Sequence, residues 1–264
     1  KVEKVEKMKY YRIIIISFAL MLNSLPSYTQ DKRTTETKVA DLLARFPSND
    51  QQFTDKLMVD MLSLGESGIM QICDQVIPAG TGDDTRPRFA IESLSRFLSG
   101  NNRDSARIVW EKICITYAIE QTDFGVKDFF MKQLQLIGGN KSAEAMKIYL
   151  SSKEINEPAL AVISAVGGKT AETILAESLK NKDLPCAAAV MNTLALMKSQ
   201  ACVNEYIEWA SSSDINIKAS AYNALAQSGN RSAYPVLLKA AKDVSYRWEA
   251  TGATSSLLAY AKVT

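Results

Sequence analysis

The chain has 264 residues, of which 47% are hydrophobic, and its 31 lysines and arginines nearly balance its 29 acidic residues. Because this composition gives no strong basic field, it argues against nucleic acid as a partner. The chain contains no histidine, which excludes Ser-His-Asp and Cys-His nucleophiles and histidine-ligated zinc. Carboxylate chemistry, lysine chemistry and all-oxygen metal sites remain open.

The first segment, residues 8–29, has the anatomy of a secretory signal peptide. Lys9 and Arg12 give it a positive start, residues 13–22 are apolar, and the polar end offers a cleavage point after Thr29. The alternative is a membrane anchor, but a span needs roughly 20 apolar residues and this run is shorter. We therefore expect an exported protein with no membrane span after signal removal, in the periplasm or at the surface of a Gram-negative bacterium. Residues 1–7 are interpreted as an upstream extension.

Helix-forming patterns follow one another from Thr34 to Gly139, with short breaks between them. Apolar residues recur at helical spacing, and each run stops at proline, glycine or a short polar loop. The predicted helices cover residues 37–46, 51–64, 67–77, 88–98, 105–121 and 124–137. Since no stretch alternates apolar and polar residues with β-branched enrichment, the sequence predicts an all-α fold without a sheet. Along the whole chain, the aspartates placed to cap a following helix are Asp50, Asp104, Asp123, Asp183 and Asp214.

The helices after residue 140 are shorter and recur with a nearly constant period. Successive helix ends fall at Gly138, Gly167, Lys198 and Gly229, which are 29, 31 and 31 residues apart. A fixed period between about 20 and 50 residues is the mark of a solenoid, in which each helix pair buries its apolar face against the next pair. The chain is therefore divided into a signal peptide with an upstream extension (1–29), irregular helical repeats (30–139) and regular repeats (140–264).

Residues 217–243, IKASAYNALAQSGNRSAYPVLLKAAKD, resemble the short HEAT repeat. The pattern is a basic residue, an alanine-rich first helix with leucine, a glycine turn, and a second helix with alanine, proline and leucine. The residues that carry it are Lys218, Ala221, Ala224, Leu225, Gly229, Ala233, Pro235 and Leu237. The repeat at 186–212 departs from the pattern because Lys198 replaces the glycine, and the repeat at 157–181 lacks the proline. The resemblance implies an α-solenoid of stacked antiparallel helix pairs.

A wider resemblance covers most of the chain. The exported start, KVADLLARFP, GIMQICDQVIPAGTGDDTR, DFFMKQLQLIGG, NKDLPCAAAVMN and YRWEATGATSSLL together look like the N-terminal helical region of large secreted bacterial proteins. Those proteins carry a C-terminal domain of the 3-keto-disaccharide hydrolase family. Residues 246–264 read as an unfinished repeat without a polar cap, so we expect the chain to continue and any catalytic domain to follow residue 264.

Four cysteines remain in the predicted mature chain, and each stands beside apolar residues: Cys73, Cys114, Cys186 and Cys202. On two antiparallel helices, Cys186 and Cys202 would be offset by roughly 15 Å along the axis, while a disulfide needs Cα atoms within about 7 Å. We expect buried free thiols. No CxxC pair suggests a zinc cluster.

The loop GTGDDTRPR, residues 80–88, is the only stretch with a hint of a metal site. Asp83 and Asp84 could offer oxygens to Ca²⁺, but their spacing is not that of an EF-hand loop. A solvated polar connection is the favoured interpretation, and no metal, cofactor or catalytic residue is assigned.

Aromatic residues beside charged ones give a candidate interaction surface, made of Tyr206, Trp209, Tyr246, Arg247 and Trp248. Tryptophan, tyrosine and arginine are enriched at binding hot spots, but aromatics at helical spacing are also typical of a core. The expected partner is another protein or an attached C-terminal domain, with carbohydrate reached through that domain.

Two functions remain in competition. The first is a non-catalytic scaffold or interaction module, the N-terminal part of a larger carbohydrate-active hydrolase. The second is an enzyme with a carboxylate-based glycoside-hydrolysing site inside this chain. Carboxylates that could in principle serve it are Asp128, Glu144, Glu172 and Glu177, although nothing in the sequence places two of them in one pocket.

Overall fold

The computed structural model describes residues 33–100 and 102–264. The predicted signal peptide and its upstream extension, residues 1–29, lie outside this described part of the chain. Within residues 33–100 and 102–264 every regular element is helical and no strand is present, as predicted. No described helix combines the length and the apolar character that crossing a membrane requires.

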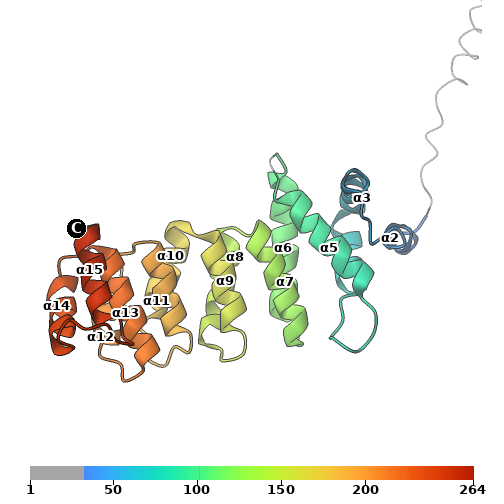
Figure 1. The fold of residues 1–264 in the computed structure, drawn as a ribbon. Helices are drawn as coiled ribbons and strands as arrows, with labels where there is room; N and C mark the ends of the chain where they lie inside the picture. Colours follow the sequence, from blue (N-terminus) through green and yellow to red (C-terminus); the bar gives the residue numbers. More distant parts are fainter. Residues whose placement is uncertain (1–32, 101) are drawn as a thin grey trace, which may run out of the picture.

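The chain forms an α-solenoid, in which helices stack side by side in the order of the sequence, from α2 and α3 at one end to α14 and α15 at the other (Figure 1). The N-terminal part contains α2 (Thr35–Leu43), α3 (Gln51–Ser63), α4 (Gly65–Cys73), α5 (Thr85–Leu98), α6 (Asp104–Glu120) and α7 (Phe124–Ile137). The C-terminal part contains α8 (Asn140–Met146), the 3-10 helix η1 (Lys147–Ser151), α9 (Asn156–Val166), α10 (Gly168–Ser178), α11 (Ala187–Leu196), α12 (Val203–Trp209), α13 (Ile215–Ser228), α14 (Ala233–Asp243) and α15 (Ala253–Val263).

The helices form two layers. In one layer α5 packs on α7 and α7 on α9, and further along α11 packs on α13 and α13 on α15. In the other layer α4 packs on α6, α6 on α8 and α8 on α10, and α12 packs on α14. Each pair therefore presents one helix to each layer, as the period in the sequence predicted.

Side-chain caps start three of the helices at the predicted aspartates. Asp50 accepts a bond from the amide of Phe53 at 3.0 Å, Asp123 from that of Val126 at 2.9 Å, and Asp214 starts α13 in the same way. Two of the expected caps are wrong. Asp104 is the first residue of α6 rather than its cap, and α11 begins only after Cys186, since a turn over residues 182–186 separates Asp183 from the helix.

Side-chain hydrogen bonds join neighbouring repeats at the same spacing as the helix period. Asn192 donates to the hydroxyl of Ser220 at 3.1 Å, 28 residues later. Trp209 donates from its indole nitrogen to the carbonyl oxygen of Leu179 at 3.0 Å, 30 residues earlier. Because such bonds form only at one register, they fix how each helix pair sits on the next.

All four cysteines are buried and free, as expected from their apolar neighbours. Burial raises the pKa of the Cys202 thiol to about 11, and it also raises the pKa values of the other three thiols. At neutral pH these groups are protonated, which leaves them unreactive core side chains.

Candidate functional site

Among the described residues, the most exposed aromatic side chains lie on the loop of residues 244–252, here called the aromatic loop, which joins α14 to α15. Ser245 and Tyr246 both have left-handed backbone conformations, with φ values of 54° and 55°. The amide of Tyr246 donates to the carbonyl oxygen of Ala241 at 2.8 Å, and that of Ser245 donates to Lys242 at 2.8 Å. These bonds close the end of α14.

Glu249 holds the second half of the aromatic loop. Its carboxylate accepts bonds from the amide of Thr251 at 2.6 Å, the hydroxyl of Thr251 at 2.7 Å and the amide of Ala253 at 3.0 Å. Partial burial acts to raise the pKa of Glu249, but the hydrogen bonds from Ala253 and Thr251 prevail and hold it below its ordinary value. The carboxylate thus accepts a bond from the first amide of α15, whose N-cap residue, Gly252, has no side chain to do so.

The aromatic loop is further fixed by the hydroxyl of Thr254, which donates to the carbonyl oxygen of Arg247 at 2.9 Å. The three side chains at its tip all face solvent, with Trp248 77% exposed and Tyr246 53% exposed. A rigid backbone that presents tyrosine, arginine and tryptophan to water has the composition of a binding hot spot. It also lowers the entropy cost of binding, because the residues are already ordered.

The other two residues of the predicted surface lie elsewhere. Tyr206 is completely buried and Trp209 is 8% exposed, with its indole bonded to Leu179 and with Lys182 5.3 Å from its ring. The structure therefore separates the five predicted residues into a core pair on α12 and an exposed triplet on the aromatic loop. Burial alone distinguishes the two groups, since their residue types are the same.

The four candidate carboxylates each form an ion pair with a lysine on the same helix or next to it. The pairs are Asp128 with Lys132 at 2.7 Å, Glu144 with Lys147 at 2.8 Å, Glu172 with Lys169 at 2.8 Å, and Glu177 with Lys180 at 2.7 Å. Bonds from Lys169 and Ser199 lower the pKa of Glu172. A general acid needs a raised pKa, so Glu172 is tuned in the opposite direction.

The loop before α5 uses both of its aspartates internally. Asp84 accepts from the amide of Ile77 at 2.9 Å and from Arg88 at 2.7 Å, and Asp83 accepts from the amide of Thr85 at 3.0 Å. Across residues 33–100 and 102–264, no group of three or more acidic, cysteine or histidine side chains is placed to hold a metal ion. The two aspartates therefore act as structural acceptors of this loop.

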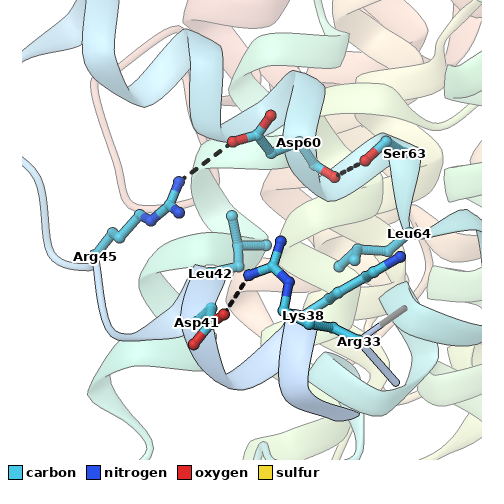
Figure 2. Close-up of a pocket in the computed structure, with 8 residues that line it drawn as sticks. All are labelled: Arg33, Lys38, Asp41, Leu42, Arg45, Asp60, Ser63 and Leu64. Atoms are coloured by element: carbon cyan, nitrogen blue, oxygen red, sulfur yellow. Dashed lines mark hydrogen bonds and ion pairs between the residues drawn. The ribbon is translucent and has the colours of Figure 1, made fainter. Parts of the chain in front are cut away.

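A pocket that the sequence did not suggest lies between α2 and α3 and has a volume of about 270 Å³. Figure 2 shows Arg45 reaching Asp60 on α3, at 3.4 Å, and Arg33 bound to Asp41. Both pairs are about half exposed, so each contributes little to stability. Ligand pockets usually have about 300 Å³ or more, and the charges of this one are paired, which makes the aromatic loop the stronger candidate.

Comparison with known proteins identifies the repeats. A family model described as HEAT repeats matches residues 171–257, which is less than half of the chain and covers the region from α10 to α15. No curated protein matches the chain. Among solved structures, human deoxyhypusine hydroxylase in complex with glycerol is similar at 13% sequence identity and a TM-score of 0.40, over 85% of this chain and 84% of that chain.

Proposed function

We propose that residues 33–264 are a non-catalytic HEAT-like scaffold that binds a protein partner through the aromatic loop. The observation that carries this proposal is the exposure of Tyr246, Arg247 and Trp248 on a loop whose backbone is fixed by hydrogen bonds. Stacked helical repeats supply long surfaces suited to protein partners. The pairing of the candidate carboxylates with lysines supports a role outside catalysis.

The proposal includes the setting predicted from the sequence. The scaffold belongs to an exported protein of the periplasm or cell surface, and a carbohydrate-active domain of the 3-keto-disaccharide hydrolase family is attached after it. Its partner is then another exported protein or that attached domain. Two direct observations test this setting: the N-terminal residue of the mature protein, expected to be Gln30, and the reading frame beyond Thr264, expected to encode a β-rich domain. A mature protein that still contains residues 8–29 contradicts export with signal cleavage.

Binding through the aromatic loop is tested by placing a photo-crosslinking amino acid at Trp248 in the cells that produce the protein. We expect one defined adduct, which excess purified protein suppresses and a Tyr246→Ala, Trp248→Ala double variant does not. The matched control carries the crosslinker at Val59, which is also exposed but lies on α3. The same adduct from both positions, or suppression by the double variant, refutes the role of the loop.

The alternative of a glycoside hydrolase inside this chain is tested with purified residues 30–264. We expect no release of sugar from disaccharide substrates, with or without added Ca²⁺. Hydrolysis that is lost in Glu172→Gln, in a protein that remains folded, overturns the non-catalytic assignment.

A further inference from the structure

A depression lies in the last repeats, at the edge opposite to the aromatic loop. The turns that follow α11 and α13 meet there with the end of α15, and the space has a volume of about 680 Å³, within the usual range of ligand sites. The aromatic loop joins the other ends of α14 and α15. The two features therefore lie at opposite ends of the last helix pair, and this inference concerns a site separate from the aromatic loop.

The charged side chains that line this depression are of one sign. Lys198 and Arg231 line it, and neither forms an ion pair with another of the described residues. No aspartate or glutamate side chain lines it. Two uncompensated cations in one concave site favour a ligand with negative charge.

Lys198 occupies a backbone position that favours glycine. Its φ is 52°, and the amide of Ser199 donates to the carbonyl oxygen of Leu194 at 3.0 Å, which is the bond pattern of a left-handed helix end. The equivalent residues of the adjacent repeats are Gly167 and Gly229, with φ values of 63° and 61°. Lys198 therefore adopts a conformation that is unfavourable for a residue with a Cβ. Its side chain distinguishes this turn from the turns at Gly167 and Gly229.

Amide groups complete the lining. The side chain of Gln200 is fixed by its bond to the carbonyl oxygen of Ser228 at 2.9 Å, and Gln227 lies beside it. The one aromatic residue of the lining, Tyr260, is buried, with its ring centroid 6.1 Å from that of Tyr234, so the depression offers no open ring face for a sugar. Glutamine amides that can donate and accept suit a peptide backbone.

We propose that this depression binds an acidic peptide segment, with Lys198 and Arg231 each pairing with a carboxylate of the ligand and the glutamine amides contacting its backbone. Such pairs are charge-assisted hydrogen bonds. Because both cations are exposed, binding weakens as the salt concentration rises.

The test is the fluorescence anisotropy of a labelled peptide of alternating glutamate and glycine, measured with residues 30–264 followed by a neutral extension that keeps the terminal carboxylate out of the depression. Lys198→Gly is the decisive variant, because glycine suits the left-handed turn and the protein should fold at least as well as the original. We expect Lys198→Gly and Arg231→Gln each to weaken binding by about tenfold. The matched control is Lys153→Ala, an exposed lysine on a different turn, which should leave affinity within about twofold.

Several results overturn the proposal. The glutamate peptide binds no better than its glutamine counterpart, or Lys198→Gly retains full affinity. Inorganic sulfate at equal concentration displaces the peptide, which shows an adventitious anion site only. An oligogalacturonate binds more tightly than the peptide, which shows an acidic sugar site instead.

Discussion

The two halves of the solenoid reach the same architecture with different cores. From α2 to α7 the interior is filled by large side chains, among them Trp110, Phe130 and Met58, and the rings of Tyr117 and Phe130 stack at 4.8 Å. From α9 to α15 small residues such as Ala224 let α11, α13 and α15 lie closely against one another. Large side chains fill irregular spaces, while alanines allow a strict period, and the HEAT-repeat match lies within the alanine-rich part, at residues 171–257.

The first way to break this comparison is to remove a large side chain from the N-terminal half. Trp110→Ala should lower the free energy of unfolding by about 3–5 kcal/mol, because it opens a cavity and removes the bond from the indole to Ser95 at 2.9 Å. Urea denaturation followed by circular dichroism measures the effect. Trp110→Phe is the control and should lose less, since most of the ring volume remains. If Trp110→Ala lowers the free energy of unfolding by less than Ala224→Leu does, the large core side chains are not what stabilises this half.

The second way to break the comparison is to enlarge a small buried side chain in the C-terminal half, where small residues allow the helices to pack closely. Ala224→Leu should cost about 1–3 kcal/mol through overpacking, because the position is buried in α13, between α11 and α15. The matched control is Ala250→Leu, at an exposed position of the aromatic loop, which should change stability by less than about 0.5 kcal/mol. Equal costs at the two positions would remove close helix approach as the explanation of the period.

The sequence predicted the helices of both halves, and single residues show which other features it could and could not predict. Helix ends such as Gly167 and Gly229 recur where the backbone has a positive φ, which favours glycine. Gly138, the helix end expected before them, has a φ of −68° and needs no such conformation. The aromatic residues carried no such information. Trp209 and Trp248 have similar neighbours in the sequence, but only Trp209 meets a preceding repeat, through Leu179. Which aromatic is buried depends on contacts between repeats, and these were not visible in the sequence. The same holds for the depression at Lys198, whose lining comes from three separate segments.

The third prediction concerns the polar bonds that fix the register between repeats. Trp209→Phe keeps most of the buried ring but removes the bond to the carbonyl oxygen of Leu179, and should cost about 1–2 kcal/mol, since a buried acceptor loses its partner. The sharper measurement is local: amide exchange should accelerate at the end of α12, where Trp209 lies, and remain unchanged in α6. The comparison is Trp248→Phe, an exposed position where no such bond exists. Exchange that accelerates uniformly along the chain would contradict a bond that acts on one register.

The smallest expected effect concerns the aromatic loop, where the carboxylate of Glu249, rather than a backbone carbonyl group, accepts the bonds from the amides of Thr251 and Ala253. Since the pKa of Glu249 is lower in the folded chain than its ordinary value of 4.5, its contribution to stability is complete above that value and is lost as the pH falls below it. Protection of the Thr251 and Ala253 amides from hydrogen exchange should therefore persist at pH 4.5 and decline only at lower pH, as the carboxylate protonates at its lowered pKa, while the amides of α13 keep theirs. Glu249→Gln should show low protection of these two amides at every pH, because a neutral acceptor forms weaker bonds than a carboxylate. Glu177→Gln is the control, on an exposed face of α10, and should leave the profile of the loop unchanged. If the loop keeps its protection at pH 3, its order comes from the left-handed residues Ser245 and Tyr246 rather than from the carboxylate.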